Sequence, residues 1–170
     1  AELLGSAFAE DYFTRNRMYP VLTWENGDRP TSLPKENGVY QISTADDLHL
    51  LSYLVRKGNT FQGETIELRA DIDLKNELWL PIGGLDEDKE HLFKGTFDGK
   101  GHRIYNLNAI ELTLGNAALF GIVDSGRIQN LGIENGTVMG KLRCAGLCAQ
   151  IRSGAVISGC YNKAQVFSTS

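Results

Sequence analysis

A glycine-punctuated segment at residues 93–107 constrains the fold more than any other feature of this sequence. Apolar or small residues occupy every second position from Phe93 to Phe97, the period of two that places one set of side chains on one face of a β-strand. Asp98 and Gly99 then begin a turn, because glycine tolerates positive φ angles and aspartate bonds its own backbone locally. The segment therefore predicts two short strands joined by a bend, each with one buried face.

The second half of this segment recurs along the chain, which indicates a solenoid. Three related segments end at positions 24 and then 29 residues apart: 101–107, 126–131 and 154–160. Self-similarity at a period of about 20 to 50 residues is typical of repeat architectures. The apolar runs are too short and too often broken by glycine for helices, so they are interpreted as strands. Coils of three short strands stacked in parallel predict an all-β fold, the parallel β-helix.

The repeats also predict which residues stack on one another. Leu107, Leu131 and Cys160 end the three segments, and we expect them to form one interior column. Asn106 and Asn130 precede two of these residues and are expected to stack at a bend, where their amides could bond backbone groups that the turn leaves unpaired.

A single helix is predicted near residues 44–57. A serine and a threonine at positions 43 and 44 are N-cap candidates, and Asp46 and Asp47 would lie at the positive end of the helix dipole. One apolar stripe follows, and Gly58 is a C-cap candidate; the stripe comprises Leu48, Leu51, Leu54 and Val55. Because the end coil of a β-helix exposes strand edges, we expect this helix to cap the first coil.

The chain of 170 residues is long enough for one domain with a sizeable core. We assign residues 38–170 to the β-helix domain and residues 1–37 to an N-terminal extension with a linker. The extension carries too many aromatic residues for a disordered tail. It is interpreted either as the end of a preceding repeat block or as a cover for an open end of the solenoid.

Composition excludes several classes of partner. The net charge is −4 and both signs are interspersed, so no basic surface for nucleic acid is predicted. No apolar run approaches the roughly 20 residues of a membrane-spanning helix, and no membrane insertion is predicted. The three cysteines cannot all pair within the chain: Cys144 and Cys148 could close a small disulfide loop, whereas all three could be buried reduced thiols.

The candidate chemistry rests on a few carboxylates. Asp71 and Asp73 are two positions apart, which on a strand places both carboxylates on one face about 6 to 7 Å apart. Such a pair could serve an inverting glycosidase or hold Ca²⁺. Asp98 could join the pair in a polysaccharide lyase or glycoside hydrolase. The alternative is that Ile72 and Leu74 point into the core while both aspartates face outward, solvated or bonded to turn amides. The histidines form no metal-binding motif: His49, His91 and His102.

The acidic segment 86–90 resembles a cation-binding loop only superficially. Calcium loops place oxygen ligands on alternate residues and use glycine for the sharp turn, which this segment lacks. We interpret it as a solvated insertion between two strands. No catalytic, cofactor-binding or metal site is therefore predicted for the chain.

The repeat segments resemble those of a known family. Residues 93–107, together with the flanking segments and a lead-in upstream, are similar to the GLUG-repeat segments of bacterial surface proteins, including those that accompany IgA-cleaving metallopeptidases; the other matching segments are 40–48, 70–74, 79–83, 119–121 and 126–131. The resemblance implies a right-handed parallel β-helix on a secreted or cell-surface protein. The chain departs from the pattern at residues 146–149, where Ala149 replaces the closing glycine.

Three hypotheses for the function follow. The first is a structural or adhesive module of a secreted or surface-anchored bacterial protein, without a catalytic site. The second is a glycan- or protein-binding module, for which exposed aromatic residues in a row would be the signature; the candidates are Tyr53, Trp79, Tyr105 and Tyr161. The third is a β-helix enzyme that acts on polysaccharides through Asp71, Asp73 and Asp98. Predicted partners are a glycan, a host or surface protein, or a second copy bound at an open solenoid end.

Overall fold

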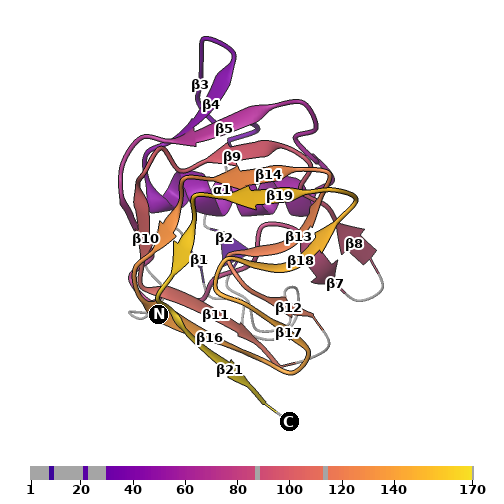
Figure 1. Ribbon diagram of the computed structural model, residues 1–170. Helices are drawn as coiled ribbons and strands as arrows, with labels where there is room; N and C mark the ends of the chain where they lie inside the picture. Colours follow the sequence, from indigo (N-terminus) through magenta and orange to yellow (C-terminus); the bar gives the residue numbers. More distant parts are fainter. Residues whose placement is uncertain (1–7, 10–20, 23–29, 87–88, 113–114, 170) are drawn as a thin grey trace.

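The computed structural model describes residues 8–9, 21–22, 30–86, 89–112 and 115–169. Over these residues the chain winds as a right-handed parallel β-solenoid of about four turns, with one helix at the end where the winding begins (Figure 1). The predicted fold class is therefore confirmed. Two further short strands pair in antiparallel fashion, β1 (Phe8–Ala9) and β2 (Val21–Leu22). Most of the predicted N-terminal extension lies outside the described residues.

Three sheets line the solenoid, and each of the last three described coils contributes one strand to each sheet. Sheet I contains β3 (Lys35–Glu36), β4 (Val39–Ile42), β5 (Thr65–Leu68), β9 (Thr96–Asp98), β14 (Arg127–Gln129) and β19 (Val156–Ser158). Sheet II contains β6 (Ile72–Asp73), β10 (Arg103–Tyr105), β15 (Gly132–Ile133) and β20 (Tyr161–Asn162). Sheet III contains β11 (Leu107–Glu111), β16 (Gly136–Gly140) and β21 (Gln165–Ser168). All pairs in these sheets are parallel except β3 with β4.

Two short parallel pairs lie between sheet III and sheet I, and one hairpin lies between β6 and β9. The parallel pairs are β12 (Asn116–Ala117) with β17 (Arg143–Cys144), and β13 (Phe120–Asp124) with β18 (Cys148–Arg152). The hairpin is β7 (Gly84–Asp86) with β8 (Lys89–His91), and its strands include Asp86, Lys89 and Glu90 of the predicted insertion. Glu90 of this hairpin accepts two hydrogen bonds from the Arg152 guanidinium, at 2.6 and 2.7 Å, which ties the insertion to a later coil.

The register within sheet I fixes the length of a coil. Ile66, Phe97, Ile128 and Ile157 are directly paired neighbours in successive coils and are 31, 31 and 29 residues apart. In sheet II, Ile72 pairs with Ile104, which pairs with Ile133. Because neighbouring parallel strands lie about 4.8 Å apart, each of these sets forms a column of side chains that runs along the solenoid axis.

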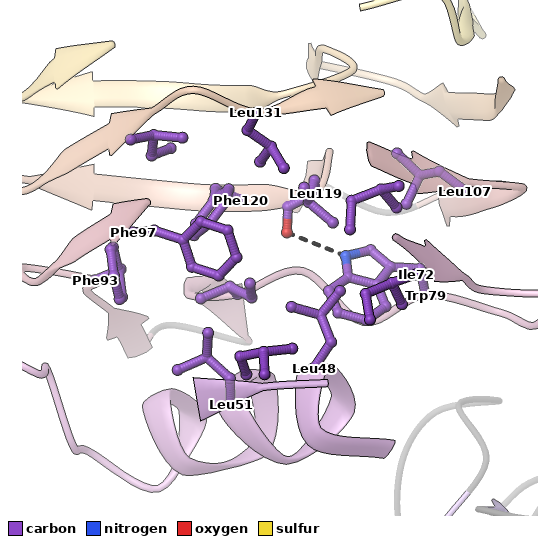
Figure 2. Packing of buried hydrophobic residues seen from close by; sticks show 14 of the residues in the cluster. Leu48, Leu51, Ile72, Trp79, Phe93, Phe97, Leu107, Leu119, Phe120 and Leu131 are labelled. Atoms are coloured by element: carbon purple, nitrogen blue, oxygen red, sulfur yellow. Dashed lines mark hydrogen bonds between the residues drawn. The ribbon is translucent and has the colours of Figure 1, made fainter. Parts of the chain in front are cut away.

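Aromatic side chains fill the centre of the solenoid. Phe120 is completely buried, and its ring centroid lies 5.4 Å from that of Phe93 and 5.2 Å from that of Phe97 (Figure 2). Trp79 is also completely buried and donates a hydrogen bond from its indole N–H to the Leu119 carbonyl, 3.1 Å away. The core is thus closed around rings that come from different coils, which ties the coils together.

The helix α1 (Ala45–Arg56) confirms the predicted capping helix. Thr44 is its N-cap: the Thr44 hydroxyl accepts from the Asp47 N–H at 3.1 Å, and the Asp47 carboxylate accepts from the Thr44 N–H at 3.0 Å, a capping box. Leu48 and Leu51 point from the helix into the core (Figure 2). The Ser52 hydroxyl donates to the Leu80 carbonyl at 2.6 Å, which fixes the helix against the first coil.

The predicted column of Leu107, Leu131 and Cys160 is wrong in its first member. Leu131 and Cys160 occupy equivalent places in successive coils, because the residues that follow them, Gly132 and Tyr161, are paired. Leu107 instead pairs with Gly136. Leu107 and Leu131 are both buried, but Leu107 begins a strand of sheet III whereas Leu131 precedes a strand of sheet II. The 24-residue spacing between Leu107 and Leu131 therefore separates two different corners of the coil.

The same shift corrects the predicted asparagine stack. Asn106 does not stack on Asn130; its partner is Asn135, 29 residues further on. The Asn106 N–H donates to the Asn135 side-chain oxygen at 2.6 Å, and the Asn135 amide donates to the Asn106 side-chain oxygen at 2.8 Å. Asparagines of neighbouring coils do meet at a bend, but the predicted partner of Asn106 is wrong.

The last described coil is less covered than the coils before it. Val166 pairs with Val138 in sheet III, yet Val166 is 42% exposed and Val138 is fully buried. Polar residues also enter this coil, since Asn162 pairs with Ile133 and Ser168 with Gly140. The strands of this coil, β19, β20 and β21, are edge strands of their sheets.

The predicted boundary near residue 37 stays a prediction. In the structure, β3 lies before it and pairs with β4 after it, and Leu33 is buried in the core. Among the described residues, no helix has both the length and the apolar character needed to cross a membrane.

Candidate functional site

Asp98 lies at the corner between sheets I and II and joins two coils there. Its carboxylate accepts from the Lys100 N–H at 2.8 Å, from the Gln129 side-chain amide at 2.8 Å and from the Asn130 side-chain amide at 3.1 Å. Burial raises the pKa of Asp98, but these hydrogen bonds outweigh it, and the pKa lies below its ordinary value. Asp98 is therefore an ionised acceptor that holds the turn of its own coil to the next coil.

Asp73 has the same role at the corner between sheets II and III. Its carboxylate accepts from the Lys75 N–H at 2.8 Å and from the Asn106 side-chain amide at 2.8 Å. Because Asn106 in turn bonds Asn135, a polar ladder runs over three coils: Asp73, Asn106 and Asn135. The ladder satisfies polar groups at the bend and repeats with the coil.

Asp71 bonds the neighbouring coil as well. One of its carboxylate oxygens accepts from the Arg103 N–H at 3.0 Å and lies 3.3 Å from the His102 ring nitrogen Nδ1. The three predicted carboxylates thus have separate sets of hydrogen-bond partners. Each set links the carboxylate to the following coil.

The described residues offer no ready metal site, and the cysteines are free. No group of three or more His, Cys, Asp or Glu side chains in the described part of the chain is placed to hold a metal ion. Cys144, Cys148 and Cys160 are unpaired and partly buried. Burial raises the pKa of Cys148 to about 11, so this thiol is protonated at neutral pH.

The predicted aromatic row is divided between the core and the surface. Trp79 and Tyr53 are buried, so neither can contact a ligand on the surface. Tyr105 is partly buried and Tyr161 is 41% exposed, and both belong to strands of sheet II. Only these two of the four candidates share a face of the solenoid.

Charged residues surround both tyrosines on the outer face of sheet II. We call this set the tyrosine face: Arg103, Tyr105, Glu134, Tyr161 and Lys163. Its residues form two neighbouring columns. In the first column, Arg103 pairs with Gly132, which pairs with Tyr161. In the second column, Tyr105 is followed by Glu134 and then by Lys163 in the next two coils. The register was needed to find Arg103, Glu134 and Lys163. The repeated Ile-x-Asn at 104–106 and 133–135 is the sequence signal that could have shown it.

Hydrogen bonds and ion pairs hold the tyrosine face in one arrangement. The Tyr161 hydroxyl donates to one Glu134 carboxylate oxygen at 2.6 Å, and the Lys163 ammonium donates to the other at 2.5 Å. The Lys163 ammonium also lies 5.4 Å from the centre of the Tyr161 ring. Gly132 leaves room for this ring, since a β-carbon at Gly132 would overlap it.

The same contacts fix the charges of the face at neutral pH. The hydrogen bond from Lys163, and then that from Tyr161, lowers the pKa of Glu134 from its ordinary value, and Glu134 raises the pKa of both partners. A hydrogen bond with the Tyr105 hydroxyl raises the pKa of Arg103. The face therefore presents two tyrosine side chains, two cations and a carboxylate.

Comparison with known proteins gives one informative similarity. The chain is 29% identical over 132 residues to halomucin of Haloquadratum walsbyi, and the match covers 69% of this chain and 1% of halomucin. The chain thus corresponds to a very small part of that protein. No family model and no solved structure matches the chain, so the resemblance to GLUG repeats stays a prediction.

Proposed function

We propose that the chain is a structural or adhesive module of a secreted or surface-anchored microbial protein and has no catalytic site of its own. The observation that carries this proposal is the use of the acidic residues. Asp71, Asp73 and Asp98 each accept hydrogen bonds from the backbone or side chains of the following coil. Such bonds between neighbouring coils stiffen a solenoid, because each of its repeats contacts only its neighbours.

The similarity to halomucin supports the extracellular setting. Halomucin is a surface protein, and the match covers 69% of this chain. A rigid rod built from stacked coils is a suitable spacer in such a setting. The GLUG resemblance implies the same location.

Binding to a second copy through the last coil stays a prediction. Within the described residues, β19, β20 and β21 are edge strands and Val166 is 42% exposed. Asn162 and Ser168 place polar groups at that end, which reduces the apolar area that pairing would bury. The tyrosine face offers a second candidate function, that of a binding module.

Replacing Asp98 by alanine tests the structural role. We expect the free energy of unfolding to fall by roughly 2 kcal/mol, because three donors lose the charged acceptor that they share. Urea unfolding of the two proteins measures the change. The matched control is Glu36→Ala: Glu36 is an exposed acid whose ion pair with Arg69 is 3.6 Å long, and its loss should change stability by less than about 1 kcal/mol.

The same protein preparations test for catalysis. The intact chain is incubated with a panel of plant, algal and bacterial polysaccharides, and reducing ends and unsaturated products are measured. We expect no release above the background. Cleavage that Asp73→Asn abolishes while the free energy of unfolding stays unchanged would overturn the proposal in favour of a polysaccharide-cleaving enzyme.

A further inference from the structure

Aromatic rings and charged groups lie together on the tyrosine face, on the outer side of sheet II. Tyr161 is well exposed, and its hydroxyl is bonded to Glu134 at 2.6 Å, so the ring is held in place before any ligand arrives. Ordering a side chain in advance lowers the entropic cost of binding. A tyrosine presents an apolar ring together with a polar group, which suits a ligand that has both kinds of surface.

The charges of the face nearly cancel. Arg103 and Lys163 are cations, Glu134 is a carboxylate in the same two columns, and Asp73 precedes Tyr105 in one of them. A polyanion would need an excess of cations, which this face does not have. The surface instead offers donors and acceptors close to each ring, so it suits an uncharged ligand that is rich in hydroxyl groups.

The dimensions suit an extended ligand. From Asp73 to Lys163 the column advances by three coils, which at about 4.8 Å per coil is roughly 14 Å. Tyr105 and Tyr161 lie two coils apart in neighbouring columns, so their rings can contact different units of one chain molecule. Because Gly132 has no side chain, the Tyr161 ring can lie over Gly132.

We propose that the tyrosine face binds a neutral saccharide chain along the solenoid axis, with sugar rings on Tyr105 and Tyr161 and hydroxyl groups bonded to Arg103, Glu134 and Lys163. The C–H groups of a sugar carry a small positive charge and pack on the negative face of an aromatic ring. Arg103 and Lys163 donate to sugar oxygens, and Glu134 accepts from sugar hydroxyls. The inference names a ligand for the surface module and rests on that proposed function only for its extracellular setting.

Calorimetric titration of the full chain tests the site. The neutral probes are cellohexaose, maltohexaose and laminarihexaose, and the acidic probes are hexamers of galacturonate and heparin. We expect at least one neutral probe to bind with a Kd below about 1 mM. Tyr161→Ala should weaken that binding about tenfold because the ring contact is lost, whereas Tyr161→Phe, which keeps the ring, should weaken it less.

Phe167→Ala is the matched control. Phe167 is an aromatic residue of the same coil, 47% exposed, but it belongs to sheet III, so its removal should leave binding unchanged. The inference is overturned if no neutral probe binds, if Tyr161→Ala binds as the natural sequence does, or if only the acidic probes bind. Capture of a protein that competes with no saccharide would also overturn it. In each of these outcomes, the structural proposal would still stand if Asp98→Ala lowered the free energy of unfolding as expected.

Discussion

Replacing Phe120 by alanine should lower the free energy of unfolding by about 3 to 5 kcal/mol. Phe120 is completely buried, and its ring contacts Phe93 at 5.4 Å and Phe97 at 5.2 Å between centroids. Phe97 belongs to sheet I, whereas Phe120 begins the strand β13, so the substitution leaves a cavity where side chains of two walls of the solenoid meet. Urea unfolding followed by circular dichroism measures the loss.

Phe167→Ala is the matched control for this substitution. It removes the same side chain from a place that is 47% exposed, on a strand at the edge of sheet III. The expected loss in the free energy of unfolding is below about 1 kcal/mol, because the Phe167 side chain buries little apolar surface when the chain folds. Equal losses for the two variants would contradict the assignment of Phe120 to the centre of the core.

Acid should destabilise the protein through His49. This residue of α1 is buried beside the Trp79 ring, with 5.0 Å between ring centroids, and burial lowers its pKa from 6.5 to about 4. In the unfolded chain the imidazole binds a proton below about pH 6.5, whereas in the folded chain it does so only near pH 4. The unfolded state therefore binds more protons between these values, and stability is lost as the pH falls from about 6.5 to 4.

The contribution of His49 should be about 3 kcal/mol over this range. Glu77, whose carboxylate lies 3.9 Å from the His49 imidazole, acts in the opposite direction, since burial raises its pKa and the folded state keeps a proton that the unfolded state loses. Burial also lowers the pKa of His91, which adds to the loss in acid. A comparison of the natural sequence with one variant separates these contributions.

Unfolding of the natural sequence and of His49→Gln at pH 7.5, 6.5, 5.5 and 4.5 provides the measurement. The difference in stability between the two proteins should change steadily in favour of the variant as the pH falls. Parallel curves over the whole range would show that His49 does not couple to unfolding, and that the helix does not bury it against Trp79.

The helix could be predicted from the sequence because its signals are local. The N-cap Thr44, the first-turn Asp47 and the stripe that includes Leu48 and Leu51 lie within three turns of one another, and all of them act as predicted. The strands could be predicted for the same reason, since alternation and glycine are read over a few residues. The solenoid followed from the recurrence of such strands.

The register could not be predicted, because the same short pattern occurs at two corners of the coil. Asn106 with Leu107 and Asn130 with Leu131 have the same letters, yet the first pair follows a strand of sheet II and the second follows a strand of sheet I. Local chemistry makes asparagine suitable at both bends, where positive φ angles occur, 56° at Asn106 and 53° at Asn130. Only the pairing of whole coils distinguishes the two corners.

The candidate site depended on this register and was therefore only half predicted. Tyr105 and Tyr161 were recognised as aromatic candidates, but their charged neighbours Glu134 and Lys163 come from other coils. Trp79 and Tyr53 could not be assigned to the core from the sequence. Tyr53 lies on α1 but outside the predicted apolar stripe, and Trp79 lies between strands, where no alternation shows which way the side chain faces.

Cross-linking of paired positions tests the coil register most directly. Thr65 and Thr96 are paired neighbours on the outer side of sheet I, and Thr96 pairs in turn with Arg127. Neighbouring parallel strands lie about 4.8 Å apart, within the range of Cα distances that a disulfide bridges, whereas two coils are about twice as far apart. The double variant Thr65→Cys with Thr96→Cys should form a disulfide in the folded protein on mild oxidation, as shown by peptide mapping that separates it from the native cysteines. Thr65→Cys with Arg127→Cys should remain reduced, and a disulfide in this second pair but not in the first would contradict the stacking of coils every 29 to 31 residues.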